Sequence, residues 1–394
     1  MGKPGFPIPP PAGGFGRAPP ARRGMGKPGF PMFTLEYECA MRIAFLTVGD
    51  PSRLTGGYLY HREVFARLRA RGLSVTEISA SGADVAAQLA AAPGLGARFD
   101  PAPFDVVVVD ALARAVCAPW LDEWRARRPL VAMVHELPSV AAGEHTHHRA
   151  STPPSPWEAP LLRADRLIAV SEDGARLLIE RGVARERISV ASGGCDRLPP
   201  RPGGPPAGPP WSALCVAQWI PRKGVLDLAR AWGRVARPGW RLELAGESDA
   251  DPAYGAAVRA ALAAAPPGSV AAHGALSDAA LAAAYARASF FALPSRYEGY
   301  GLVFAEALAA GLPVVARAVG PLPELVGPDA GLLAPPDDDV ALDAALARLM
   351  DDAALRERMA GAARARAAAL PTWERCAAAF LGALEAAIAA RRRS

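Results

Sequence analysis

The segment from Ser289 to Val315 constrains the fold most, because it combines a strand, a glycine-rich turn, a helix and a second strand in one short unit. Ser289 to Leu293 is a short apolar run that ends at a proline, which is typical of a buried parallel strand. Gly299 and Gly301 bracket a tight turn. Leu302 to Ala310 then reads as a helix that is closed by a glycine and a proline.

Two carboxylates stand at fixed places in this unit. Glu298 lies in the turn and Glu306 in the second turn of the helix, with seven residues between them. The free N–H groups of a helix that follows a flexible turn favour anions such as phosphate. Carboxylates beside such a site indicate a ligand that also carries hydroxyl groups, since hydroxyls donate to carboxylate oxygens. Phosphate together with hydroxyls suggests a sugar nucleotide. The simpler interpretation is a helix with two solvated carboxylates.

The same residues resemble the Glu-x7-Glu signature of the family 4 retaining glycosyltransferases, which have the GT-B fold. The resemblance implies that Glu298 contacts the donor sugar and that Glu306 binds the ribose hydroxyls. It also implies that backbone amides near Tyr300, Gly301 and Leu302 hold the donor diphosphate.

A second segment, Val216 to Gly224, resembles the part of this family whose arginine and lysine clamp the donor diphosphate. Lys223 and Gly224 match the family pattern, and Lys223 is the only lysine outside the first 40 residues. Gln218 stands where the family has its arginine, so half of the clamp lacks its usual residue. Arg222 could supply the missing charge, although adjacent residues need not face the same way. The simpler interpretation of Lys223 is a solvated surface lysine.

Two features of the first half fit the same interpretation. Gly56 and Gly57 join the first expected strand to the first helix, where the family's Gly-Gly pair approaches the donor phosphates or the acceptor. His135 follows the apolar strand at 130–134, and catalytic groups collect at the carboxyl ends of parallel strands. The resemblance places His135 near the donor sugar or the acceptor. A flexible loop and a structural histidine are the alternatives.

Strands alternate with helices from Met41 onward, which predicts parallel sheets with helices on both faces. We therefore predict the α/β class, with two doubly wound, Rossmann-like domains that face each other across a cleft, as in the GT-B architecture. The expected parts are a disordered low-complexity extension at 1–40, an acceptor-side domain at 41–197, a Pro-rich linker at 198–210, a sugar-nucleotide-binding domain at 211–375, and a helix at 376–394 that could cross back to the first domain.

The expected strands are short and apolar. They lie at 41–48, 73–78, 104–110, 130–134, 167–171 and 188–191 in the first domain, and at 213–218, 242–245, 270–272, 290–293 and 313–316 in the second. The stretch from Asp337 to Arg393 is expected to be helical throughout.

Composition argues against several other classes of protein. No apolar run approaches the ~18 residues of a membrane span. A net +3 of the formal charge of +5 lies in the first 40 residues, so no nucleic-acid partner is expected. The five cysteines are scattered, which suits free thiols in a reducing cytoplasm rather than a metal site. No Gly-x-Gly-x-x-Gly follows the first strand of either domain, which counts against a dinucleotide oxidoreductase.

Two further clusters have alternative interpretations. His145, His147 and His148 could bind zinc in principle, but we prefer a polar loop on the acceptor side. The arginines of the first helix, Arg62 and those from Arg67 to Arg71, could contact anionic lipid as in some members of the family, or could form a solvated face.

Together these features predict a retaining glycosyltransferase that moves a sugar from a nucleoside diphosphate sugar to the hydroxyl of a glycan or a lipid-linked glycan. Glu298, His135 and Lys223 are expected in the catalytic site. No cofactor and no metal are expected, because protein cations and amides offset the diphosphate charge. We expect a cytoplasmic enzyme that could contact the inner membrane face peripherally. The alternatives are a GT-B sugar-nucleotide epimerase, a phosphorylase, and a non-catalytic module that binds sugar nucleotides.

Overall fold

The computed structural model describes residues 40–141 apart from Leu54 and Ala83, together with 155–199, 201 and 208–393. The three clustered histidines His145, His147 and His148 lie outside these residues, as do nearly all of the expected extension at 1–40 and much of the linker at 198–210. Within the described part of the chain, no helix is both long enough and apolar enough to cross a membrane.

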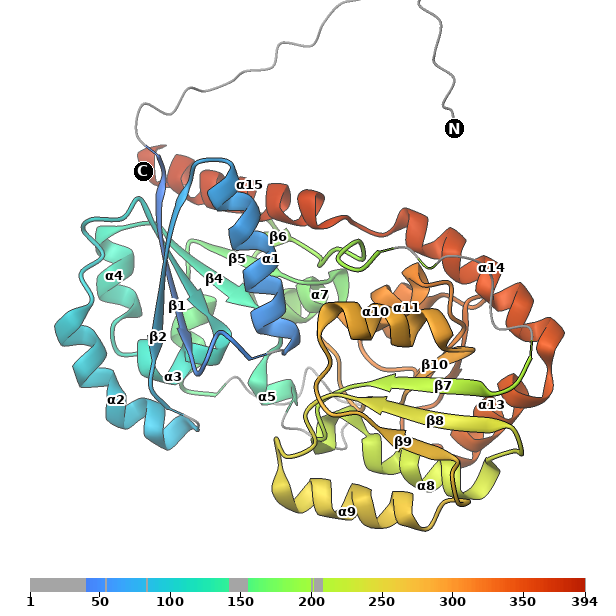
Figure 1. Cartoon of the computed structure of the whole chain (residues 1–394). Helices are drawn as coiled ribbons and strands as arrows, with labels where there is room; N and C mark the ends of the chain where they lie inside the picture. The colour runs from blue at the N-terminus through green and yellow to red at the C-terminus, as the bar shows by residue number, and fades with distance from the viewer. Residues whose placement is uncertain are drawn as a thin grey trace, which may run out of the picture. The chain divides into compact units, whose positions relative to one another are not determined.

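The first domain is built on a parallel six-stranded sheet in the order β2-β1-β3-β4-β5-β6 (Figure 1). Its strands are β1 (Arg42–Val48), β2 (Ser74–Ala80), β3 (Val106–Asp110), β4 (Leu130–Val134), β5 (Arg166–Ala169) and β6 (Ile188–Val190). Its helices are α1 (Gly56–Ala70), α2 (Val85–Arg98), α3 (Arg114–Cys117), α4 (Leu121–Arg127), α5 (Pro138–Ala141), α6 (Ala159–Leu162) and α7 (Glu172–Glu180), with 3-10 turns η1 (Ala111–Ala113) and η2 (Arg185–Arg187).

The two central strands of this sheet determine where polar groups can gather. Every residue of β3 and β4 is buried, as expected for strands covered by helices on both faces. Asp110, the last residue of β3, pairs in register with Met133 of β4. The carboxyl ends of β3 and β4 therefore lie side by side, and the residues that follow them share one edge of the sheet.

The second domain repeats the plan with a parallel sheet in the order β12-β11-β10-β7-β8-β9. Its strands are β7 (Trp211–Val216), β8 (Trp240–Ala245), β9 (Val270–Ala272), β10 (Phe290–Leu293), β11 (Val314–Arg317) and β12 (Gly331–Ala334). Its helices are α8 (Val225–Val235), α9 (Pro252–Ala263), α10 (Asp278–Arg287), α11 (Leu302–Ala309), α12 (Leu322–Val326), α13 (Asp339–Asp351) and α14 (Ala353–Ala369), with the 3-10 turn η3 (Pro221–Lys223). The predicted α/β class with two Rossmann-like domains is confirmed.

Four details differ from the sequence-based expectation. The stretch from Asp337 to Arg393 is not one continuous helix, because Asp352 and residues 370–372 separate three helices. Strand β12 was not predicted, because it is short and its two leucines are only half-buried. Helix α1 begins at Gly56, where the side chain of Thr55 accepts a hydrogen bond from Tyr58 N at 3.4 Å. The Gly-Gly pair thus forms the first helical turn rather than a connecting loop. The last helix, α15 (Trp373–Arg393), begins three residues before the expected Cys376.

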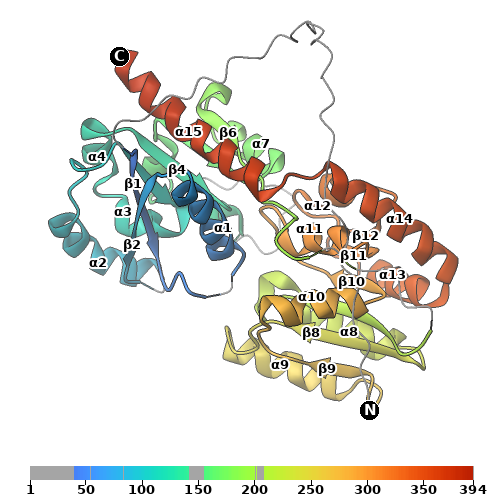
Figure 2. The ribbon, with the colours of Figure 1, turned by 45° about the horizontal axis from the view of Figure 1, so that its top comes forward.

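Helix α15 follows the helices of the second domain in sequence but packs on the first domain. Its residues Trp373, Phe380 and Leu384 are buried in one apolar cluster with Phe45 of β1 and Phe65 of α1. Figure 2 shows α15 in red beside α1 in blue. The end of the chain therefore completes one face of the first sheet.

Candidate functional site

The turn between β10 and α11 carries Glu298, and a lysine reaches it from another connection. The Nζ atom of Lys223 lies 2.6 Å from Oε1 of Glu298. The hydroxyl of Ser295 donates to the same oxygen at 2.7 Å. Glu298 is only 4% exposed, so this ion pair is largely shielded from water. Two of the residues predicted for the site therefore meet in one buried cluster.

The charges of this cluster support each other. Burial by itself acts to raise the pKa of Glu298, but the neighbouring charges of Lys223 and Arg222 outweigh it and hold the pKa below its ordinary value. Burial lowers the pKa of Lys223, and the carboxylate of Glu298 opposes that shift. We infer a charged pair at neutral pH, because each partner favours the ionised form of the other.

Gly224 explains how Lys223 comes so close to the turn. Its φ angle is 65°, in the left-handed region, and a Cβ atom at this position would lie 2.2 Å from the carbonyl oxygen of Pro294. Only glycine allows η3 to pack this tightly on the end of β10. The match of Gly224 to the family pattern thus has a local steric reason.

Arg222 faces a different partner from Lys223. Its Nη1 atom lies 3.6 Å from Oε2 of Glu136, which follows β4 in the first domain. The same nitrogen donates to the carbonyl oxygen of Tyr297 at 3.4 Å. Arg222 thus lies near the cluster, but its ion pair is with Glu136 and not with Glu298. Its role as a replacement cation stays a prediction.

Gln218, at the position of the family arginine, is linked to a cation of the first domain. Its Nε2 atom donates to Oε2 of Glu247 at 2.6 Å. Arg53, in the connection between β1 and α1, donates from Nη2 to both carboxylate oxygens of Glu247 at 2.7 and 2.8 Å. Sequence reasoning missed Arg53, because nothing in its neighbourhood distinguishes it from the other arginines.

Glu306 lies in a separate network. Its Oε1 atom accepts from Nε of Arg197 at 3.0 Å and from Nη2 of the same arginine at 2.6 Å. The hydroxyl of Tyr285 donates to Oε2 at 3.2 Å. Burial raises the pKa of Glu306 above its ordinary value, although Arg197 and Tyr285 oppose the shift. The predicted ribose-binding carboxylate is therefore already held by an arginine that the sequence did not single out.

The turn after β10 touches the first domain at Gly299. A Cβ atom there would lie 1.9 Å from the carbonyl oxygen of His135, so any larger residue would require the turn to move. The carbonyl oxygen of Gly299 accepts a hydrogen bond from the hydroxyl of Ser171 at 2.7 Å. The turn that carries Glu298 is thus held against the residues that follow β4 and β5.

The remaining predicted residues lie around this junction. Gly301 is the N-cap residue of α11 and has a φ of 96°. The side chains of Tyr300 and Leu302 pack against the apolar cluster of the first domain. A Cβ atom on Gly56 would lie 3.9 Å from Cδ1 of Leu302. A Cβ atom on Gly57 would lie 3.8 Å from Cδ2 of His135.

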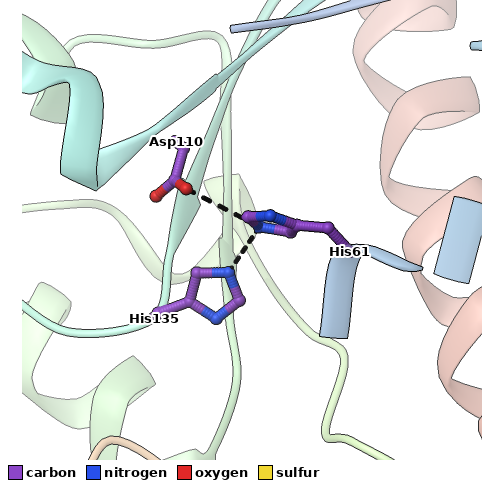
Figure 3. Close-up of side chains that lie close together, drawn as sticks. All are labelled: His61, Asp110 and His135. Carbon is purple, nitrogen blue, oxygen red and sulfur yellow. Dashed lines mark hydrogen bonds and ion pairs between the residues drawn. The ribbon is translucent and has the colours of Figure 1, made fainter. Parts of the chain in front are cut away.

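His135 is half-buried and lies in a cluster with two buried side chains that the sequence did not point to (Figure 3). Its Nε2 atom lies 2.7 Å from Nε2 of His61 on α1. The same nitrogen of His61 lies 3.7 Å from Oδ2 of Asp110. Asp110 accepts from the hydroxyl of Thr47 at 2.9 Å and from Leu112 N at 2.9 Å. His61 directly follows the Gly-Gly-Tyr-Leu-Tyr segment, and Asp110 ends a buried strand, which are the two signals that could have found them.

Burial dominates the titration of this cluster. It lowers the pKa of His135 to about 4, and burial followed by the neighbouring His135 lowers the pKa of His61 well below its ordinary value. Burial raises the pKa of Asp110 to about 7, although hydrogen bonds from Leu112 and Thr47 oppose the shift. Both histidines are therefore neutral at neutral pH. The possible ligand atoms of these three side chains all lie within 4.8 Å of one another. Among the described residues they are therefore a group that could hold a metal ion.

The arginines of α1 are engaged in ion pairs. Arg62 lies 3.7 Å from Asp278, Arg69 lies 2.7 Å from Glu77, and Arg71 pairs with Glu374. Arg67 pairs with Glu63 at 2.8 Å. Since each positive charge faces a carboxylate, this helix offers little unbalanced charge to an anionic surface, and the predicted lipid contact remains a prediction.

A hollow of about 410 Å³ lies elsewhere in the second domain, between α9 and the edge strand β9. Its lining includes Trp219, Arg259 and Leu262, and none of the residues predicted for the site. We therefore place the candidate site by its buried ion pairs and not by this hollow.

Two family profiles match the sequence, one in each domain. The profile described as Glycosyltransferase Family 4 matches residues 60–197. The profile described as Glycosyl transferases group 1 matches residues 212–352. The match in the second domain contains Lys223, Glu298 and Glu306, and the match in the first domain contains His135.

Curated relatives resemble part of the chain. The MMP alpha-(1->4)-mannosyltransferase of Mycolicibacterium hassiacum is 44% identical over 117 residues, which is 29% of this chain and 28% of the relative. A GDP-mannose-dependent monoacylated alpha-(1-6)-phosphatidylinositol monomannoside mannosyltransferase of Corynebacterium glutamicum is 34% identical over 169 residues, which is 41% of this chain and 43% of the relative. The matched stretches thus span less than half of either relative.

Solved structures share the fold over nearly the whole described chain. The sucrose-phosphate synthase of Thermosynechococcus elongatus has a TM-score of 0.72 at 24% identity, over 89% of this chain and 100% of that one. The Anabaena protein HepE in complex with UDP-glucose has a TM-score of 0.67 at 18% identity, over 88% of this chain and 100% of that one. These likenesses confirm the predicted GT-B fold. Because the two profiles together match both domains, the chain belongs to the family 4 glycosyltransferases.

Proposed function

We propose that this protein is a retaining glycosyltransferase that moves a hexosyl group from a nucleoside diphosphate sugar to a hydroxyl of a glycan or a lipid-linked glycan. The observation that carries the proposal is the ion pair at the turn before α11 between Glu298, which is buried, and Lys223, whose side chain is 17% exposed. This arrangement argues against a solvated surface lysine and a solvated carboxylate. Shielding two charges from water costs free energy unless they pair with each other or with a ligand.

In the proposed reaction the bond between the anomeric carbon and the diphosphate oxygen breaks, and a bond from that carbon to the acceptor oxygen forms on the same face. Lys223 and the backbone amides at the start of α11 would stabilise the negative charge of the departing diphosphate. Glu298 would orient the sugar by accepting hydrogen bonds from its hydroxyls. The acceptor proton would pass to the leaving phosphate, so the proposal needs no general base.

The donor diphosphate would change the partners of Lys223. Its ammonium group lies 2.6 Å from Oε1 of Glu298. An ammonium group has three donors, so Lys223 could keep that contact while it binds a phosphate oxygen. Glu306 would bind the ribose with the remaining lone pair of Oε2, since each carboxylate oxygen has two lone pairs, Arg197 donates twice to Oε1 and Tyr285 donates once to Oε2.

The names of the similar proteins suggest the first donors to test. One relative is named as GDP-mannose-dependent, and one structural neighbour holds UDP-glucose. The proposal includes no metal and no organic cofactor, and it places the enzyme in the cytoplasm with at most a peripheral membrane contact. A sugar-nucleotide epimerase and a non-catalytic binding module remain the alternatives, although no observation favours either one.

The test is a panel of sugar nucleotides that begins with GDP-mannose and UDP-glucose, with and without simple glycoside acceptors. We expect release of the nucleoside diphosphate together with a glycosylated product whose anomeric configuration, read by NMR, equals that of the donor. Glu298→Gln should lower kcat by about 10²–10³, as is typical when one contact to a transition state is lost. Glu123→Gln, on the exposed surface of α4, is the matched control and should keep full activity.

The alternatives give different results in the same assay. An epimerase would convert the sugar without releasing a nucleoside diphosphate. A binding module would show a thermal shift with a sugar nucleotide and no turnover. A product of inverted configuration, or a Glu298→Gln variant with normal turnover, would contradict the proposed mechanism.

A further inference from the structure

The cluster of His61, Asp110 and His135 combines buried polar contacts with close aromatic packing. His61 is 3% exposed and Asp110 is fully buried. The ring of His61 stacks on Phe65 with an interplanar angle of 9° and meets the edge of Phe45 at a centroid distance of 4.5 Å. These aromatic contacts leave the ring little freedom to turn. Its Nε2 atom therefore stays directed at His135 and Asp110, as Figure 3 shows.

The contact between the two histidines restricts where their protons can be. Both rings are neutral at neutral pH, because burial lowers the pKa of each. A neutral imidazole carries one N–H and one bare nitrogen. The two Nε2 atoms are 2.7 Å apart, which is a hydrogen-bond distance, so one of them carries the proton and the other accepts it. The two rings must therefore adopt opposite tautomers.

Asp110 decides which ring donates. Its Oδ2 atom lies 3.7 Å from Nε2 of His61 (Figure 3). An ionised carboxylate favours a proton on that nitrogen and repels a bare lone pair there. Thr47 and Leu112 each donate to Asp110, which supports the ionised form against the cost of burial. With its proton on Nε2, His61 donates to Nε2 of His135.

We propose that His61 is a positioning residue that holds His135 in the tautomer with its proton on Nδ1, so that His135 offers an N–H donor, and not a basic nitrogen, to the sugar nucleotide. The Nδ1 atom of His135 points away from His61 and Asp110 (Figure 3). A donor at this place suits an oxygen of the transferred sugar or of the leaving phosphate. The inference rests on the proposed function, in which the acceptor proton passes to the phosphate and no histidine base is required.

The same three side chains fit a bound metal ion less well than this hydrogen-bonded chain. Two ligands that each lie about 2.0 Å from a tetrahedral zinc ion are roughly 3.3 Å apart. The two Nε2 atoms are closer than that. Both oxygens of Asp110 also accept hydrogen bonds from the protein already. Zinc binding is nevertheless a distinct outcome of the test.

The direct test is the tautomer of His135 in the full chain at pH 8, where Asp110 is ionised, with all six histidines labelled with ¹³C and ¹⁵N. The signals of His135 are assigned by their loss in His135→Gln. We expect a proton on Nδ1 and a bare Nε2 in the wild type. His61→Gln places an amide N–H close to the position of the imidazole Nε2 and should keep this tautomer. His61→Phe keeps an aromatic ring beside Phe65 but has no donor, and should give a mixture of both tautomers.

Kinetics and metal content complete the test. His61→Phe should lower kcat by roughly tenfold or more with little change in the KM for the donor, and His61→Gln should recover most of the loss, since a donor to the transition state acts on the chemical step. A proton on Nε2 of His135 in the wild type would overturn the proposal, and so would an unchanged tautomer in His61→Phe. Stoichiometric zinc in the wild type that is absent from His61→Phe would also overturn the proposal. The tautomer is read without substrate, so a protein that lacks transferase activity but has the expected tautomer refutes only the proposed function.

Discussion

Lys223 and Glu298 lie in two different connections of the second domain and form an ion pair that is largely shielded from water. The side chain of Lys223 is 17% exposed and that of Glu298 is 5% exposed. A buried pair of this kind is costly to break from one side, because the remaining charge loses both its partner and its hydration. Removing both charges at once is much less harmful, since no ion is then left in the buried site.

Single and double variants of this pair should show the asymmetry. Lys223→Met should lower the free energy of unfolding by about 2–3 kcal/mol, somewhat less than the ~3–5 kcal/mol of a fully buried pair, because the lysine is partly exposed. The double variant Lys223→Met/Glu298→Gln should be more stable than Lys223→Met alone, and urea denaturation followed by circular dichroism measures both. A double variant no more stable than the single one would show that the pair is not coupled.

The turn between β10 and α11 is the element that joins the two domains at the candidate site. It carries Glu298, and Gly299 touches the carbonyl oxygen of His135 and the hydroxyl of Ser171. The position of Glu298 therefore depends on contacts from two elements of the other domain. A small displacement of reacting groups can cost a large factor in rate.

We predict that Gly299→Ala disturbs catalysis more than it disturbs folding. The added methyl group would lie 1.9 Å from the oxygen of His135, so the turn must move away from β4. We expect kcat/KM to fall by roughly tenfold to a hundredfold, with only a few degrees of change in Tm. Gly233→Ala is the control, because that helical glycine meets nothing within 4 Å and the change should stabilise α8 by about 0.5–1 kcal/mol. Normal kinetics in Gly299→Ala would contradict the importance of this junction.

At the scale of the whole molecule, α15 makes the end of the chain part of the first domain. Phe380 and Leu384 are fully buried against residues of β1 and α1, more than 300 positions earlier in the sequence. Helices α13 and α14, just before α15, bury their apolar residues in the core of the second domain. The stability of the first domain therefore depends on a segment that follows the second domain in the sequence.

Phe380→Ala should destabilise the first domain by about 3–5 kcal/mol, which is typical when a buried aromatic ring is removed from a core. Hydrogen exchange followed by mass spectrometry should show faster exchange in β1 and α1 and unchanged exchange in β7 and β8. Arg392→Ala, at an exposed position of the same helix, is the control. Faster exchange confined to the second domain would show that α15 does not support the first.

Local sequence patterns predicted the strands and helices near the site well. Phe290–Leu293 is a strand as expected, and α11 begins at Leu302. A short apolar run between turn residues and a helix closed by Gly311 are encoded within a few neighbouring residues. Lys223 also stood out, because it is the only lysine after the first 40 residues. The half-buried edge strand β12 was missed, because its pattern is weak.

The two alternating α/β halves and the unit that carries Glu298 could be predicted from the amino acids, since both depend on periodicity and turn chemistry over short distances. The folded structure was needed to see that Glu306 meets Arg197, 109 positions away, and that His61 meets His135, 74 positions away. Parallel strands are joined by crossover helices, so residues at neighbouring carboxyl ends come from distant parts of the chain. Which of them meet depends on strand order and register, and no local pattern of residues contains that information.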